Sequence, residues 1–207
     1  MKSKEVDPRI KALTGEVAEG KTARHIEDMI NTALGFGRDR ATIAEVKLMS
    51  RALREMRNAA RIFARYNRVK KVAVFGSART KPEQDEYKQA VAFGEKIVEH
   101  GYMLITGGGD GIMGAAQKGA GAEKSFGLNI RLPFEQAANE TIHGDPKLIN
   151  FNYFFFLENN IYLFIDILSN DNFKIYKLLI NLSTSSDFTN KQVESDQHSR
   201  VSLLFSL

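Results

Sequence analysis

The chain has 207 residues, of which 43% are hydrophobic and 26% charged, values typical of a soluble globular protein with one core and room for an appendage. It contains no cysteine and only four scattered histidines, which excludes disulfides and leads us to expect no metal site. The N-terminus holds lysines and acids and no apolar segment, so we expect no signal peptide, no membrane partner and a cytoplasmic location.

The N-terminal part is basic and helical in pattern. Residues 1–70 carry 16 Lys and Arg against 9 Asp and Glu, a net charge of +7. The spacing of apolar residues predicts helices over 22–34 and 42–66, separated by a glycine-containing break at 35–39. We therefore assign residues 1–67 to a basic helical N-terminal extension.

The second of these predicted helices carries two stripes at helical spacing. The apolar stripe, which we expect to be buried, comprises Val46, Met49, Leu53, Met56, Ala60 and Phe63. Beside it runs an arginine stripe: Arg51, Arg54, Arg57, Arg61, Arg65 and Arg68. Guanidinium groups on one helix face could follow nucleic-acid phosphates, but no aromatic or groove-reading motif accompanies them. We favour a solvent-facing helix side and expect no nucleic-acid partner.

From residue 68 the pattern changes to alternating strands and helices. Short apolar runs that end in glycine or threonine predict buried parallel strands, and amphipathic segments between them predict helices. Gly101 stands where a helix would end. The predicted elements are strands at 71–75, 102–106 and 125–130, and helices at 84–99 and 112–118. This order predicts an α/β fold, with a Rossmann-like parallel sheet and helices on both faces, over residues 68–156.

The composition shifts again near the C-terminus. Ala138 is the last alanine and Gly144 the last glycine, so the final 63 residues contain neither. Parallel sheets normally use small residues where strands turn into helices. We therefore expect an incomplete sheet and treat residues 157–207 as a divergent tail. Within it, 161–168 and 173–182 could be strands or buried helices, and 183–200 is polar and predicted to be loose.

A glycine-rich turn between the second strand and its helix carries the strongest chemical signal. Residues 107–111 read Gly-Gly-Gly-Asp-Gly and are called the glycine turn below. Glycines let the backbone approach an anion closely, and the first amides of the following helix supply donors and partial positive charge. The turn therefore predicts a phosphate site. A carboxylate beside a phosphate is repulsive, so we interpret Asp110 as the cap of the helix.

A second turn, Gly76-Ser77, follows the first strand. Because carboxyl ends of parallel strands share one edge, we expect it to meet residues 106–109 and the segment after Ile130 at one crevice. No Gly-Lys-Ser/Thr follows the glycine turn, which argues against a P-loop NTPase. Residues 109–114 do fit the dinucleotide pattern, but Asn129 stands where the ribose-binding acid is expected, so dinucleotide binding is the lesser possibility.

Several motifs in order resemble the LOG (Lonely Guy) family. They are Val-Ala-Val-Phe-Gly-Ser-Ala-Arg at 72–79, Gly-Tyr-Met-Leu-Ile-Thr-Gly-Gly-Gly-Asp-Gly-Ile-Met at 101–113, and Gly-Leu-Asn-Ile-Arg-Leu-Pro-Phe-Glu-Gln at 127–136, followed by Asn139. The resemblance implies a Rossmann-like, homodimeric phosphoribohydrolase that needs no cofactor and cleaves AMP or a cytokinin ribotide to free base and ribose 5-phosphate. The nucleotide- and phosphate-binding positions it implies are Gly76, Ser77, Thr106, Gly107, Gly108, Gly109, Gly111, Met113 and Glu135.

The chain departs from the family after Phe156. Family members continue with an Arg-Lys pair and a Pro-Gly-Gly-x-Gly-Thr-x-x-Glu loop, which supply the catalytic Arg and Glu, whereas Leu157-Glu158 stands here and no glycine follows. We therefore assign no catalytic residue and expect hydrolysis to be impaired, because an apolar residue replaces a cation that would stabilise a charged transition state. A non-catalytic nucleotide-binding protein is the alternative. We hypothesise that the tail is not the family's own sequence, as a frameshift or aberrant splice would cause.

Overall fold

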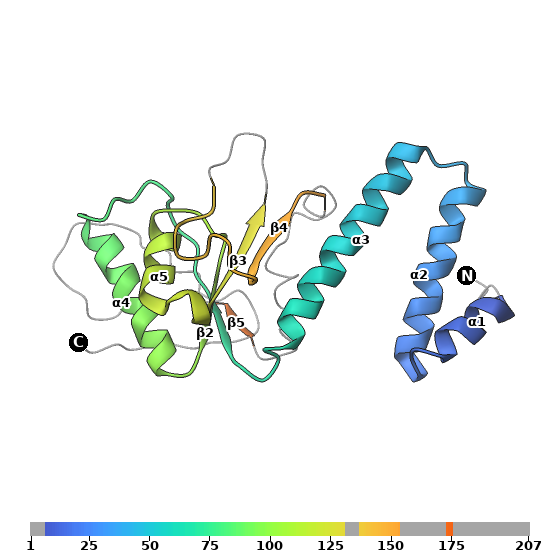
Figure 1. Ribbon diagram of the computed structural model, residues 1–207, viewed down its shortest axis with the longest axis horizontal. Helices are drawn as coiled ribbons and strands as arrows, with labels where there is room; N and C mark the ends of the chain where they lie inside the picture. The colour runs from blue at the N-terminus through green and yellow to red at the C-terminus, as the bar shows by residue number, and fades with distance from the viewer. Residues whose placement is uncertain (1–6, 131–136, 154–172, 176–207) are drawn as a thin grey trace. The chain divides into compact units, whose positions relative to one another are not determined.

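The computed structural model describes residues 7–130, 137–153 and 173–175 (Figure 1). The chain divides into two compact units, Met1–Ser50 and Arg51–Leu207. The residues expected to bind nucleotide all belong to the second unit, which is built on a parallel sheet.

The first unit is helical and contains α1 (Pro8–Gly15), α2 (Gly20–Arg38) and the beginning of α3 (Ile43–Ala64). Helix α1, which the sequence did not predict, begins where the Asp7 side chain accepts a hydrogen bond from the Arg9 amide at 2.9 Å. The helix break predicted to begin at Gly35 begins later, because α2 continues through Gly35 and Gly37 and ends at Arg38. Glycine inside a helix costs only about 1 kcal/mol, which a helix of 19 residues tolerates.

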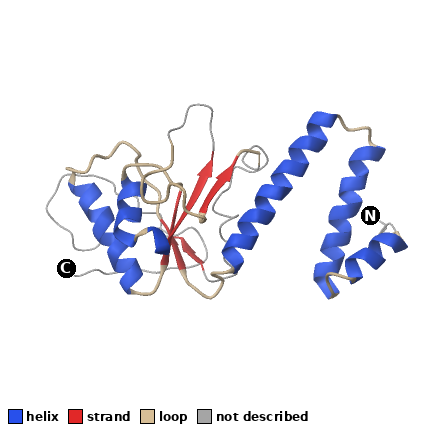
Figure 2. Ribbon diagram, in the orientation of Figure 1, coloured by secondary structure: helices blue, strands red, loops and turns tan. Residues whose placement is uncertain are grey.

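The second unit confirms the predicted α/β class. The five strands that the structure describes in this unit are all parallel and lie in the order β4-β3-β2-β1-β5. They are drawn in red in Figure 2. The strands are β1 (Lys71–Ala73), β2 (Met103–Thr106), β3 (Ser125–Ile130), β4 (Leu148–Phe151) and β5 (Phe173–Ile175). Strand β3 has the predicted bounds, and β1 is two residues shorter than predicted. Strand β5 comes from the divergent tail and pairs with β1, so the tail contributes an edge to the sheet.

Helices α4 (Asp85–Glu99) and α5 (Ile112–Ala120) cover one face of this sheet, and a short 3-10 turn, η1 (Ala122–Lys124), leads from α5 into β3. The two helices touch backbone to backbone. A Cβ added at Gly94 would lie 2.1 Å from the Ala116 carbonyl oxygen, and one at Gly119 would lie 2.0 Å from that of Val91. Only glycine fits at these crossings, and the closeness fixes α5 against the sheet.

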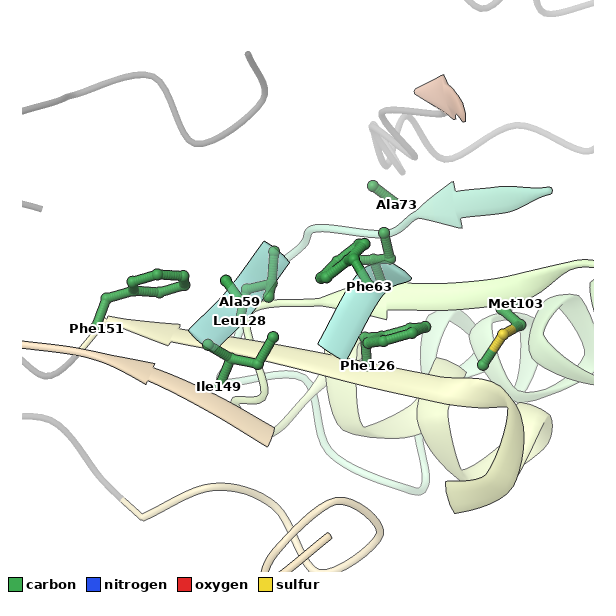
Figure 3. Packing of buried hydrophobic residues seen from close by; sticks show 9 residues of the cluster. Ala59, Phe63, Ala73, Met103, Phe126, Leu128, Ile149 and Phe151 are labelled. Atoms are coloured by element: carbon green, nitrogen blue, oxygen red, sulfur yellow. The ribbon is translucent and has the colours of Figure 1, made fainter. Parts of the chain in front are cut away.

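The C-terminal half of α3 covers the opposite face. Phe63 stacks on Phe126 with ring centroids 4.7 Å apart, and Ala59 packs beside it among β-strand side chains (Figure 3). The buried positions of α3 are Ala52, Ala59 and Phe63, with Met56 partly buried. The helix therefore uses its small residues to approach the sheet.

The predicted apolar stripe of α3 is accordingly wrong over much of its length. Val46, Met49 and Leu53 are 43%, 38% and 46% exposed, and Ala60 is exposed as well. Positions 52, 56, 59 and 63 repeat at helical spacing and define a face displaced from the one made by the larger side chains. Close packing of α3 against the strand side chains favours alanine at position 59, and this face leaves the bulkier residues at 46, 49 and 53 exposed.

Lys71 is a buried charge at the start of β1. Its Nζ donates hydrogen bonds to the carbonyl oxygens of Tyr66 and Val69, at 2.8 and 2.9 Å. These carbonyls lie in the turn between α3 and β1, so the ammonium ties that turn to the sheet. Burial lowers the pKa of Lys71 below its ordinary value.

Candidate functional site

Two turns meet at the carboxyl edge of the sheet. The Gly76-Ser77 turn follows β1 and the glycine turn follows β2, and the Ile112 amide donates a 3.0 Å hydrogen bond to the Ser77 carbonyl oxygen. A Cβ added at Gly111 would lie 2.1 Å from that same oxygen, and one at Gly76 would lie 2.6 Å from the Ile112 side chain. Both glycines are therefore required for the turns to touch.

The glycine turn has a fixed internal shape. Gly108 and Gly111 both adopt positive φ, at 77° and 65°, which only glycine does at little cost. The hydroxyl of Thr106, fully buried at the end of β2, accepts a 2.9 Å hydrogen bond from the Gly108 amide. The side chain of Met113 lies against the turn, since Cβ atoms added at Gly107 and Gly109 would come within 3.2 and 3.0 Å of it.

This shape leaves a set of unused donors at the N-terminus of α5. The backbone amides of Gly109, Asp110, Gly111 and Met113 donate no hydrogen bond to any residue that the structure describes. Unsatisfied amides at the start of a helix, reinforced by the helix dipole, form a favourable environment for an anion. The geometry is therefore suited to a phosphate group.

The prediction that Asp110 caps α5 is wrong. The capping position is Gly111, at φ 65° and ψ −130°, and no side chain caps the helix. The chain reverses at Gly111, so Asp110 lies one residue too early and is exposed. Its carboxylate therefore accepts no hydrogen bond from the first amides of α5.

A buried amide pair, which sequence reasoning did not assign a role, supports the turn from behind. The Asn139 Nδ2 donates to the carbonyl oxygens of Gly108 and Gly109, at 2.9 and 3.0 Å, and to Gln117 Oε1 at 2.6 Å. Gln117 in turn donates to the Phe126 carbonyl oxygen at 3.2 Å. Asn139 thus binds the turn through two of its carbonyl groups, those of Gly108 and Gly109, and makes no hydrogen bond to its amides. Its presence in the family-like motif was the only signal in the sequence that could have found it.

A second asparagine pair lies on the exposed side of the same edge. Asn129 Nδ2 donates to Asn150 Oδ1 at 3.0 Å between register partners on β3 and β4. A Cβ added at Gly108 would lie 3.8 Å from the Asn129 Cβ, which places this pair directly beside the glycine turn.

The end of β4 is held by α3. The Glu55 carboxylate accepts hydrogen bonds from the backbone amides of Asn152 and Tyr153, each at 3.0 Å. The Arg51 guanidinium lies over the Tyr153 ring, 4.9 Å from its centroid. The first arginine of the arginine stripe is therefore half-buried against Tyr153, while the remaining five are exposed, among them Arg61, which donates to Asn58 Oδ1 at 3.0 Å.

Some expected positions lie outside the described residues. Glu135 is one of them, and so are Leu157 and the residues that follow it to 172. Within the described ranges, no group of three or more His, Cys, Asp or Glu side chains is arranged to hold a metal ion. Among the helices that the structure describes, none is both long and apolar enough to cross a bilayer.

Comparison with known proteins gives a family match for the site region. Residues 69–145 match the SLOG cluster4 family, which includes LOG-like proteins. Among solved structures, the chain is similar to the Moco carrier protein from Chlamydomonas reinhardtii, with 27% identity and a TM-score of 0.29, over 40% of this chain and 48% of that one. The chain thus spans about half the length of that protein. No curated protein gives a significant match.

Proposed function

Residues 69–145 belong to the SLOG cluster4 family, and from this premise we propose that the protein binds a nucleoside 5′-monophosphate, with its phosphate on the glycine turn. The phosphate accepts hydrogen bonds from the amides of Gly109, Asp110, Gly111 and Met113 at the N-terminus of α5. The single observation that supports this best is the set of unused amides in a turn that Asn139 holds through the carbonyl groups of Gly108 and Gly109.

The remaining expected positions have supporting roles in this proposal. Gly76 and Gly111 let the two turns touch, and Ser77 supplies the carbonyl oxygen that holds the Ile112 amide. Thr106 fixes the conformation of Gly108. The carboxylate of Glu135 is the group that we expect to contact the ligand near its sugar, as the LOG resemblance implies.

The reaction we propose for this site is hydrolysis of the N-glycosidic bond, giving free base and ribose 5-phosphate, at a strongly reduced rate. Cleavage develops positive charge on the ribose, so the transition state needs a nearby carboxylate and activated water. The LOG resemblance places the catalytic Arg and Glu after the Tyr-Phe-Phe segment, where this sequence has Leu157-Glu158. Binding should therefore exceed catalysis in this chain.

Two measurements test the proposal. Calorimetric titration should show AMP binding at least tenfold more tightly than adenosine, because a charge-assisted phosphate contact contributes about 1.5–3 kcal/mol. Chromatography of AMP incubated with the protein should show little or no free adenine. Equal affinity for AMP and adenosine would remove the phosphate assignment, and turnover at rates normal for enzymes would show that catalytic groups exist elsewhere in the chain.

A further inference from the structure

The Asn129–Asn150 pair lies on the ligand side of the sheet. Side chains alternate along a strand, and Phe126, Leu128, Ile149 and Phe151 all pack into the core beneath α3. The asparagines between them therefore point to the opposite face. The glycine turn bends over that face, because a Cβ at Gly108 would lie within 3.9 Å of the backbone of Gly127 and 3.8 Å from Asn129.

The pair has unused hydrogen-bonding groups. Asn129 is partly exposed and Asn150 is exposed, and the bond between them uses one amide hydrogen of Asn129 and the side-chain oxygen of Asn150. With the described residues, neither side chain makes another hydrogen bond. Asn129 Oδ1 is left as an acceptor, and Asn150 Nδ2 is left with donors.

The place of the pair in the topology indicates what it would bind. In parallel sheets that hold dinucleotides, the phosphates lie on the glycine turn, and a residue near the end of the following strand binds the ribose hydroxyls. Here β3 follows the glycine turn and α5, and Asn129 is its penultimate residue. A neutral carboxamide can accept from a hydroxyl without repelling a phosphate bound next to it.

We propose that Asn129 and Asn150 together bind the vicinal hydroxyl groups of the ribose of a nucleoside 5′-monophosphate whose phosphate lies on the glycine turn. Asn129 Oδ1 accepts a hydrogen bond from the 2′-hydroxyl, and Asn150 Nδ2 donates to the oxygen of the 3′-hydroxyl. This inference rests on the proposed function and adds to it the recognition of ribose against deoxyribose.

The test compares AMP with 2′-deoxy-AMP on four forms of the full chain: the wild type, Asn129→Ala, Asn150→Ala and Asn58→Ala. Asn58 is an exposed asparagine on α3 and serves as the matched control. The wild type and the control should bind AMP about fivefold to tenfold more tightly than 2′-deoxy-AMP, the effect of one hydrogen bond. Asn129→Ala should lose that preference while keeping its affinity for 2′-deoxy-AMP within about twofold.

The outcomes separate the two proposals. If neither nucleotide binds better than adenosine, the proposed function fails and this inference fails with it. If both nucleotides bind but the wild type does not distinguish them, or if Asn129→Ala weakens both equally, only the ribose assignment is overturned. Asn150→Ala changes an exposed side chain, so it tests the ribose assignment should Asn129→Ala fold poorly: it should weaken AMP and 2′-deoxy-AMP alike, and unchanged affinity for both would overturn the contact of Asn150 with the ribose.

Discussion

Substituting Gly111 by alanine should separate the two turns that form the site. The new Cβ would lie 2.1 Å from the Ser77 carbonyl oxygen and 2.8 Å from the Ala78 Cα, both backbone atoms that cannot rotate away. The positive φ of 65° adds a conformational cost of about 1–3 kcal/mol. Relieving the overlap adds about 1–3 kcal/mol more. We therefore expect Gly111→Ala to lower the free energy of unfolding by about 2–6 kcal/mol.

Gly121→Ala is the matched control. Gly121 has a φ of 76° but nothing within 4 Å of its added Cβ, so it carries the conformational cost without the overlap. Urea unfolding of both variants, followed by circular dichroism, measures the difference directly. Gly111→Ala should be about 1–3 kcal/mol less stable than Gly121→Ala. Equal stability of the two variants would refute the backbone contact between the turns.

The same variants should differ in ligand binding. Gly111 is part of the proposed phosphate site, whereas Gly121 lies at the other end of α5. Where Gly111→Ala remains folded, calorimetric titration should show a loss of at least tenfold in AMP affinity, and Gly121→Ala should bind AMP as the wild type does. Unchanged AMP affinity in folded Gly111→Ala would contradict the placement of the phosphate.

Three further predictions concern buried groups, the second of them paired with a control at the exposed Gly37. Asn139→Asp should destabilise the protein by about 2–4 kcal/mol in urea unfolding and abolish AMP binding, because a carboxylate would face three oxygen acceptors. Gly94→Ala should lower the free energy of unfolding by about 1–3 kcal/mol, again measured in urea, because the new Cβ would overlap the Ala116 carbonyl. Gly37→Ala is the control: its Cβ would meet open space in α2, so it should raise the helix content slightly in circular dichroism. Burial lowers the pKa of Lys71 in the folded wild type, so between that lowered pKa and 10.5 the unfolded chain binds more protons than the folded one. The free energy of unfolding of the wild type should therefore rise with pH over this range, and Lys71→Met should remove this contribution.

Each of these has a clear contrary result. An Asn139→Asp variant as stable as the wild type would mean that the amide does not hold the turn. A neutral Gly94→Ala variant would show that α4 and α5 pack less closely than described, and a loss of helix content in Gly37→Ala would show that this glycine has a role beyond the helix. If the free energy of unfolding of the wild type and of Lys71→Met depended on pH in the same way, the Lys71 ammonium would be exposed to solvent rather than buried.

The sheet was predictable because its strands are short apolar runs that end in turn residues. Strand β3 at 125–130 lies between turn signals and matches its predicted bounds. Strand β4 escaped prediction because its four residues, Leu-Ile-Asn-Phe, include the polar Asn150 and give no clear period. The face of α3 was misassigned because large apolar residues were taken as buried, whereas the alanines at 52 and 59 are buried instead.

The site was predictable to the extent that topology alone determines it. Parallel strands place the Gly76-Ser77 turn and the glycine turn at one edge, and that adjacency follows from strand order. The contact of Asn139 with the glycine turn could not be predicted from strand order, because it joins residues 31 positions apart and Asn139 lies outside any helix or strand. The cap assigned to Asp110 failed for a local reason: glycine conformations at Gly111 displaced the helix start by one residue.

The groups proposed for binding and the groups expected for catalysis come from different parts of the sequence. The turns that we propose as phosphate donors follow β1 and β2, within the family match at 69–145, whereas the LOG resemblance implies that the groups that would cleave the glycosidic bond come after the end of β4. At that end of β4 the Glu55 carboxylate accepts hydrogen bonds from the backbone amides of Asn152 and Tyr153. Where the LOG resemblance implies a cationic side chain, the sequence has Leu157. Since phosphate affinity and transition-state stabilisation depend on different groups, the first can persist where the second is lost.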